Sequence, residues 1–229
     1  MIEIVVSLLV AIATIAGLWW YFKTYGNVGV GGTQNIQKAT QDGRKSTTTN
    51  VDIQRSLNQK EGLTFSYTCW LRIDDFTYRY GEQRVVFTKG PEDLSAMCPA
   101  VFIDGTTNTL LVKIDTFGGT EVIPIANIPA KKWMHLALAV DQDSIDIYVN
   151  GTLHTHHTLT QVPKQNNSVV RTGVKGGFEG KIANLIYYAY FLTPETVQAT
   201  MQSPPTPDSA DISAPTPPYF DISWWTGRK

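Results

Sequence analysis

The sequence predicts an all-β antiparallel sandwich preceded by one N-terminal transmembrane α-helix. Between residues 63 and 191, short apolar or alternating segments recur between turn residues. That spacing is typical of a β-sandwich or a barrel. Residues 4–22 form an uncharged apolar run, and one short helical pattern follows the last strand. These features together predict a membrane anchor, a sandwich domain and little other helix.

The anchor is predicted over residues 1–25. Its uncharged part would span about 28 Å as a helix, close to the thickness of the hydrocarbon layer. Aromatic side chains gather at its C-terminal end, as at a membrane interface, and the lysine that follows can extend to the head groups. A cleaved signal peptide is the alternative, but the start lacks a basic region and the run does not end in small residues. The anchor residues are Ile4, Trp19, Trp20, Tyr21, Phe22 and Lys23.

Charge predicts the orientation of this anchor. No basic side chain precedes the helix, and four follow it: Lys23, Lys38, Arg44 and Lys45. The positive-inside rule therefore predicts a single-pass protein with its N-terminus outside and its domain in the cytosol. Glycosylation sequons at Asn150 and Asn166 argue weakly for the opposite orientation.

Residues 26–48 are rich in Gly, Gln, Asn, Thr and Lys and show neither the helical nor the strand period. They predict a flexible spacer, which could reach roughly 60–70 Å if extended. Val51 and Ile53 alternate with polar residues and are expected to open the first strand.

The sandwich domain is predicted over residues 49–202. Its first long strand, residues 63–73, places alternate side chains on one face: Phe65, Tyr67, Cys69, Leu71 and Ile73. A helix should begin after Thr193, an N-cap residue followed by proline and glutamate, and end near Gln202. The other strands are expected at residues 84–89, 100–103, 109–115, 121–125, 133–140, 145–149, 152–159 and 180–191.

The most informative stretch is residues 133–151. Residues 133–140 are almost wholly apolar, as in a strand buried on both faces. Ile145, Ile147 and Val149 then alternate with polar or aromatic residues. Asn150-Gly151 follows, a strong hairpin signal because both residues tolerate positive φ.

Three segments occur in an order that resembles the concanavalin A-like, or laminin-G-like, family. They are F-S-Y-T-C-W-L-R-I at residues 65–73, W-M-H-L-A-L-A-V with I-Y-V-N-G at residues 133–151, and F-E-G-K-I-A-N-L-I-Y-Y with L-T-P-E-T-V at residues 178–197. The resemblance implies a jelly-roll sandwich. It leaves function open, because this fold serves lectins, glucanases, adhesion modules and structural modules. The residues that mark the fold are Trp133, His135, Asn150, Gly151 and Gly180.

The sequence contains no string of alternating carboxylates of the kind that glucanases of this fold use. Asp141-Gln142-Asp143 comes nearest but falls in a polar turn, so we expect no enzyme activity. His154, His156 and His157 cluster on one strand without an evident third ligand, and an exposed strand face is the favoured interpretation. We expect His135 to be a hydrogen-bonded structural residue.

No cofactor is predicted. Some laminin-G-like modules bind Ca²⁺ through loop aspartates, and Asp104, Asp115 and Asp141 lie in loop regions, but no motif supports a calcium site. A sugar site would need aromatic and amide side chains. Its conceivable lining residues are Trp70, Tyr78, Tyr80 and Asn108.

Two segments are candidate partner contacts. The loop at residues 74–83 carries three aromatic side chains, which favours recognition over packing. Residues 203–229 form a proline-rich tail that should be extended and that ends in aromatic side chains, typical of a docking segment. The candidate contact residues are Phe76, Tyr78, Tyr80, Tyr219, Phe220, Trp224 and Trp225.

Composition excludes one class of partner. The net charge is −1, with acidic and basic residues interspersed, so no basic surface for nucleic acid is expected. Cys69 falls in a strand pattern and should be a small buried residue, and a bridge to Cys98 is the less favoured alternative.

Three functions stay open. The layout is similar to that of minor capsid proteins of large DNA viruses with an internal membrane, which implies a non-enzymatic protein that links a bilayer to other proteins of a capsid or coat. The alternative is a membrane-tethered lectin-like or adhesion module, with glycans as partners and an outward-facing domain. A glycan hydrolase is the third, disfavoured for want of paired carboxylates.

Overall fold

The computed structural model describes residues 14–17, 32–51, 53, 56 and 62–205. Residues 14–17 are helical. The rest of the predicted anchor and the tail beyond Pro205 lie outside the described residues, so both stay predictions. Within the described ranges, no helix is both long and apolar enough to cross a bilayer.

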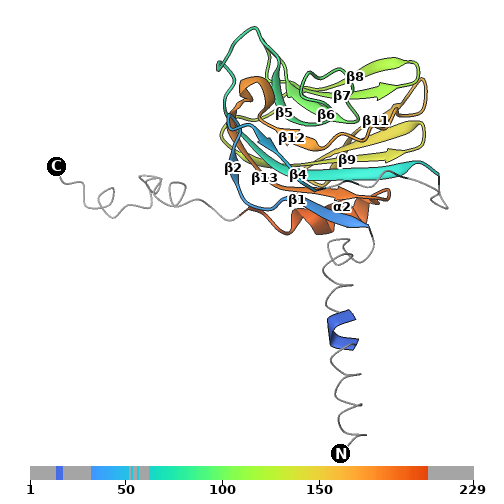
Figure 1. The fold of residues 1–229 in the computed structure, drawn as a ribbon. Coiled ribbons are helices and arrows are strands. Elements are labelled where there is room, and N and C mark those ends of the chain that lie inside the picture. Colours follow the sequence, from blue (N-terminus) through green and yellow to red (C-terminus); the bar gives the residue numbers. More distant parts are fainter. Residues whose placement is uncertain (1–13, 18–31, 52, 54–55, 57–61, 206–229) are drawn as a thin grey trace, which may run out of the picture.

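The domain is a sandwich of two antiparallel sheets (Figure 1). Sheet A has seven strands, in the order β1-β13-β4-β9-β10-β11 with β2 beside β13, and sheet B has six, in the order β3-β12-β5-β6-β7-β8. The strands of sheet A are β1 (Thr33–Gln37), β2 (Gln41–Asp42), β4 (Thr64–Asp75), β9 (Trp133–Asp141), β10 (Ser144–Val149), β11 (Thr152–Thr158) and β13 (Glu179–Tyr188). The strands of sheet B are β3 (Thr47–Thr48), β5 (Arg84–Lys89), β6 (Ala100–Ile103), β7 (Leu110–Thr116), β8 (Gly119–Ile125) and β12 (Val170–Thr172).

The main core lies between the sheets. The predicted inner face of β4, from Phe65 to Ile73, is buried there, opposite inward-facing residues of sheet B such as Phe87, Val101 and Val112. Cys69 and Cys98 are free and buried, and burial raises the pKa of each thiol to about 12. The expectation that Cys69 is a small core residue is confirmed.

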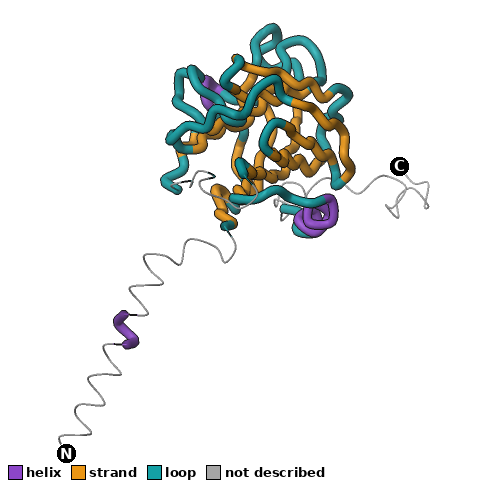
Figure 2. The backbone as a smooth tube through the Cα atoms, turned by 90° about the vertical axis from the view of Figure 1, so that its right-hand side faces the viewer, coloured by secondary structure: helices purple, strands orange, loops and turns teal. Residues whose placement is uncertain are grey.

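A second, smaller core lies on the outer face of sheet A, under the helix α2 (Pro194–Met201) (Figure 2). Val197 of the helix packs near Ala137 and Ala139, whose small side chains let it approach the sheet. The Thr193 side chain accepts a hydrogen bond from the Thr196 N–H, as expected of the N-cap.

The spacer prediction fails for its second half. Residues 33–48 contain β1, β2 and β3, which pair with β13 and β12, whereas Val51 and Ile53 belong to no strand. These strands are polar because they lie at sheet edges, so they show no apolar alternation. Their backbone hydrogen bonds to the sandwich hold them in place. The domain thus begins at about Thr33.

The Asn150-Gly151 turn joins β10 and β11, and both residues have positive φ. The Asn150 Oδ1 accepts a hydrogen bond from the His135 N–H at 2.9 Å. His135 is 1% exposed, and its Nε2 lies 3.4 Å from the Thr200 hydroxyl of α2. The turn, the central strand β9 and the helix are therefore tied together at one place.

Candidate functional site

A polar groove lies where β2, the end of β4 and the start of β13 meet. It is open to solvent and has a volume of about 280 Å³. That volume lies just below the range of small-molecule sites, about 300–1,000 Å³. The lining residues are Thr40, Gln41, Asp42, Arg44, Asp74, Glu179, Gly180 and Lys181.

The charges of the groove are arranged as pairs. The Arg44 guanidinium lies 3.2 Å from the Glu179 carboxylate and 3.6 Å from that of Asp42. The Asp74 carboxylate lies 2.7 Å from the Arg72 Nε. All these side chains are partly exposed, so they present carboxylate oxygens and N–H donors side by side to solvent.

Close backbone packing holds the segments that line the groove together. The Gly43 N–H donates to the Gly180 carbonyl at 2.8 Å, and the Phe178 N–H donates to the Gly43 carbonyl at 3.2 Å. Gly180 has φ +152°, and a Cβ there would collide with the Arg72 carbonyl. A glycine is therefore required at this fold-marking position, because it lets β13 lie against β4.

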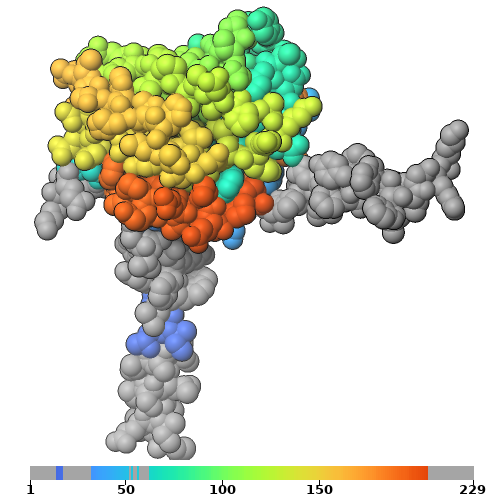
Figure 3. Space-filling model, turned by 180° about the vertical axis from the view of Figure 1, so that it is seen from behind, coloured from blue at the N-terminus to red at the C-terminus, as the bar shows by residue number. Residues whose placement is uncertain are grey.

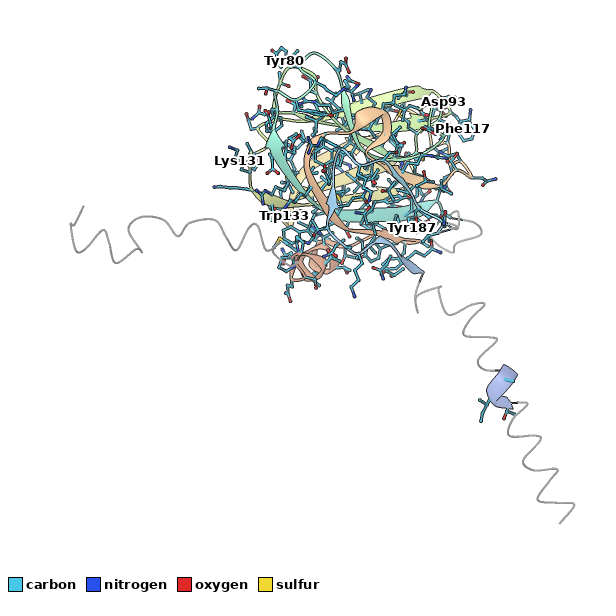
Figure 4. The ribbon with its side chains drawn as sticks, turned by 60° about the vertical axis from the view of Figure 1, so that its left-hand side comes forward. Tyr80, Asp93, Phe117, Lys131, Trp133 and Tyr187 are labelled. Atoms are coloured by element: carbon cyan, nitrogen blue, oxygen red, sulfur yellow. The ribbon has the colours of Figure 1, made fainter. Side chains whose placement is uncertain are left out.

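The aromatic loop, defined as residues 76–82, lies at the same end of the domain. Phe76 is half-buried against the main core, whereas Tyr80 is 67% exposed. The Tyr78 hydroxyl donates to the Gly176 carbonyl at 3.2 Å, and Arg79 donates to the Lys175 carbonyl. Figure 4 shows Tyr80 at the end of the domain away from Trp133 and Tyr187.

The buried side chain of Arg84 holds this loop in place. Its side chain is 1% exposed, and its guanidinium donates to the carbonyls of Phe76 (2.6 Å), Tyr78 (3.0 Å) and Asp104. Burial lowers the pKa of Arg84, against an opposing effect of Asp104. One buried cation thus joins the aromatic loop to the β6–β7 turn.

The groove and the aromatic loop share two backbone segments. Asp74 in the groove lies two residues before Phe76, and residues 175–181 hold the loop at one end and line the groove at the other. The short 3-10 turn η1 (Val174–Gly176) supplies the two carbonyls that hold the loop. We treat the groove and the loop as one candidate site.

Other sequence-predicted site residues lie elsewhere. Trp70 lies on the outer face of sheet A, with its ring 5.3 Å from that of His135, so it does not join Tyr78 and Tyr80. Asn108 lies in the turn between β6 and β7, and its side chain donates to the Ile128 carbonyl.

The aspartates and histidines considered as metal ligands have local partners. Asp104 accepts hydrogen bonds from Thr106 and Thr107, which lower its pKa to about 2. Asp115 accepts from the Met97 N–H, and Asp141 is exposed at the end of β9. His156 contacts Asp146, and His157 contacts Glu121. Among the described residues, no cluster of three or more His, Cys, Asp or Glu side chains could hold a metal.

Residues 45–198 match the family model of the concanavalin A-like lectin/glucanase superfamily. The match covers more than half of the chain, which therefore belongs to this superfamily. A search of curated protein sequences finds no match.

Similar solved structures include receptor-binding domains of botulinum neurotoxins. The domain of neurotoxin D has a TM-score of 0.55 at 9% identity, over 69% of this chain and 40% of that one. The domain of neurotoxin DC, solved with rat synaptotagmin II, has a TM-score of 0.53 at 15% identity, over 69% and 39%. A structure of botulinum neurotoxin type C, whose cell entry depends on interaction with two ganglioside molecules, has a TM-score of 0.52 at 14% identity, over 69% and 39%.

These comparisons define the fold. This chain spans about two fifths of each of those three neurotoxin chains. Neither the family nor these neighbours supports the minor capsid interpretation. The groove was missed in the sequence because half of its residues come from the segment interpreted as a spacer, and Asp74 lies more than a hundred positions from the remaining residues, 179–181.

Proposed function

We propose that this protein is a non-enzymatic, lectin-like recognition module, tethered to a membrane by residues 1–25, whose polar groove binds a glycan. The observation that carries the proposal is the groove itself, with carboxylates and cationic donors arrayed side by side beside an exposed aromatic loop. Such a surface can donate to and accept from the hydroxyl groups of a sugar. Both activities in the superfamily's description concern glycans.

Binding is favoured over hydrolysis by the pairing of the carboxylates. Asp42 and Glu179 contact Arg44, and Asp74 contacts Arg72. A glycosidase needs two carboxyl groups that act on the sugar, one as general acid and the other as nucleophile or base. The carboxylates of the described groove instead contact guanidinium groups, and this array of oxygens and N–H groups suits hydrogen bonding to a neutral sugar better than bond cleavage.

Replacing Asp74 with Asn and Glu179 with Gln should weaken glycan binding at least tenfold. Each change removes a charge-assisted hydrogen bond, typically 1.5–3 kcal/mol, and about 1.4 kcal/mol corresponds to a factor of ten in Kd. The measurement is a glycan array with the full chain, followed by titration of the strongest ligand.

The matched control is the pair Asp143→Asn and Glu92→Gln, which changes the net charge equally at exposed positions outside the groove. It should bind as the wild type does. Equal loss in both pairs would indicate a general charge effect, and an array without any ligand would reject the proposal.

The proposed role requires the domain on the outer side of the membrane, opposite to the side that the charge rule predicts. Lys38, Arg44 and Lys45 lie within the folded region that starts at Thr33, and the charges of a folded domain have little effect on orientation. The rule then rests on Lys23 alone.

N-glycosylation in eukaryotic cells tests the orientation. Asn150 is exposed, and among the described residues its side chain is bonded through Oδ1, whereas the Asn166 Nδ2 donates to the Lys89 carbonyl. We expect a mass shift that glycosidase treatment removes and that Asn150→Gln abolishes, with Asn166→Gln retaining it. An unmodified chain whose domain is digested only from the cytosolic side would support the charge rule instead.

A further inference from the structure

Sheet A has an open edge at β11. β11 is the last strand of its sheet, and among the described residues it pairs only with β10. Each of its seven residues is exposed or half-buried, and Leu153 is 48% exposed. Such an edge presents backbone N–H and C=O groups that another strand can bond.

This edge has one of the usual protections against strand pairing, a β-bulge at His154, where the register with β10 shifts. It lacks the others, because natural edge strands also carry Pro, Lys or other charges, or are very short. β8, the edge of sheet B, contains Glu121 and Pro124, and β3 has two residues. The β11 sequence, T-L-H-T-H-H-T, contains no Pro, Lys, Arg, Asp or Glu.

The chain carries a segment that fits this edge. Residues 219–225 read Y-F-D-I-S-W-W, in which Phe220, Ile222 and Trp224 alternate with Tyr219, Asp221, Ser223 and Trp225. That is the period of a strand with one wholly apolar face and one mixed face that has an aromatic residue at each end. The segment has seven residues, the same number as β11.

The linker between α2 and residues 219–225 is long enough to bring that segment to β11. The last turn of α2 lies beside the start of β11, because a Cβ on Gly151 would lie 3.4 Å from the Met201 sulfur. Figure 3 shows the yellow surface of β10 and β11 adjoining the orange-red surface of α2. Residues 206–218 connect Pro205 to Tyr219, and in a polyproline conformation they would reach about 40 Å at roughly 3.1 Å per residue. A seven-residue strand is only about 23 Å long.

We propose that residues 219–225 fold back in the same molecule and pair with β11 as an additional edge strand of sheet A. Phe220, Ile222 and Trp224 then cover the exposed side of Leu153, next to Tyr148 and α2. The tail aromatic residues thereby have an intramolecular site in place of the external partner that the sequence alone suggests. The pairing is independent of the glycan-binding groove.

Amide hydrogen exchange of the full chain, in micelles or nanodiscs, tests this pairing. The variant Phe220→Asp with Trp224→Asp removes the apolar face of the segment. The outward amides of residues 152–158 should exchange at least tenfold faster in this variant than in the wild type. The control Ser209→Asp with Ser213→Asp adds the same charge to the tail outside the segment and should leave the protection unchanged.

A second variant tests the edge itself. Leu153→Lys should release residues 219–225, observed as faster exchange of their own amides, while α2 stays protected. Equal exchange in the wild type and the tail variant would overturn the proposal. Protection that grows with protein concentration, together with a dimeric mass, would show that the tail pairs with a second copy and would also overturn it.

Discussion

Replacing Arg84 with Met should lower the free energy of unfolding by about 3 kcal/mol or more. The change leaves the carbonyls of Phe76, Tyr78 and Asp104 buried without their donor, and an unsatisfied buried polar group costs roughly 1–3 kcal/mol. Because the same guanidinium holds the aromatic loop, amides of residues 76–82 should also lose exchange protection. Chemical denaturation of the full chain and hydrogen exchange measure the two effects.

Two further variants test whether the loss from Arg84→Met depends on the geometry and the burial of the guanidinium. Arg84→Lys keeps the charge but cannot reach three carbonyls with a planar fork, so an intermediate loss is expected. Arg44→Met removes a half-exposed guanidinium and should cost less than about 1 kcal/mol. A loss from Arg84→Met as small as that from Arg44→Met would contradict the role of Arg84 as an anchor.

Acidification from pH 7 to pH 4 should remove up to about 3 kcal/mol of stability through His135. Burial lowers the pKa of His135 to about 4, whereas an unfolded histidine titrates near 6.5. The unfolded state therefore binds more protons between these values, and stability falls as pH falls from about 6.5 to about 4. The difference of about 2.5 units at 1.36 kcal/mol per unit sets the magnitude.

The variant His135→Gln should flatten this part of the stability curve, because glutamine does not titrate. His154→Gln, at an exposed position, serves as the control. Carboxylates with lowered pKa values, such as Asp75 and Asp104, begin to lose their contribution below about pH 5. Because they do so equally in the wild type and in the variants, the difference between the stability curves isolates His135. Equal slopes between pH 6.5 and 4 in the wild type and His135→Gln would refute the assignment.

The sandwich could be predicted from the sequence because its central strands have strong local signals. The predicted bounds at residues 84–89 and 100–103 coincide with β5 and β6, and the Asn150-Gly151 hairpin and the Thr193 cap lie where the patterns predict them. In each of these places, apolar periodicity or turn chemistry agrees with the tertiary fold.

The strands missed in the sequence, β1, β2, β3 and β12, are short or polar and depend on pairing with distant partners. The same applies to the candidate site. The position of Arg84 at the start of a strand indicates a surface residue. Only the fold brings three carbonyls around its guanidinium. The groove joins residues near 42, 74 and 180, which no local pattern relates.

The most direct test of the central claim, that the polar groove binds a glycan, is the location of the ligand. Backbone NMR shifts of the full chain should be followed during titration with the strongest oligosaccharide from the array. Binding in the groove predicts that the shifts concentrate at residues 40–44, 74 and 179–181 and disappear in Asp74→Asn with Glu179→Gln. Shifts confined to another face of the sandwich, with the groove residues unchanged, would contradict it.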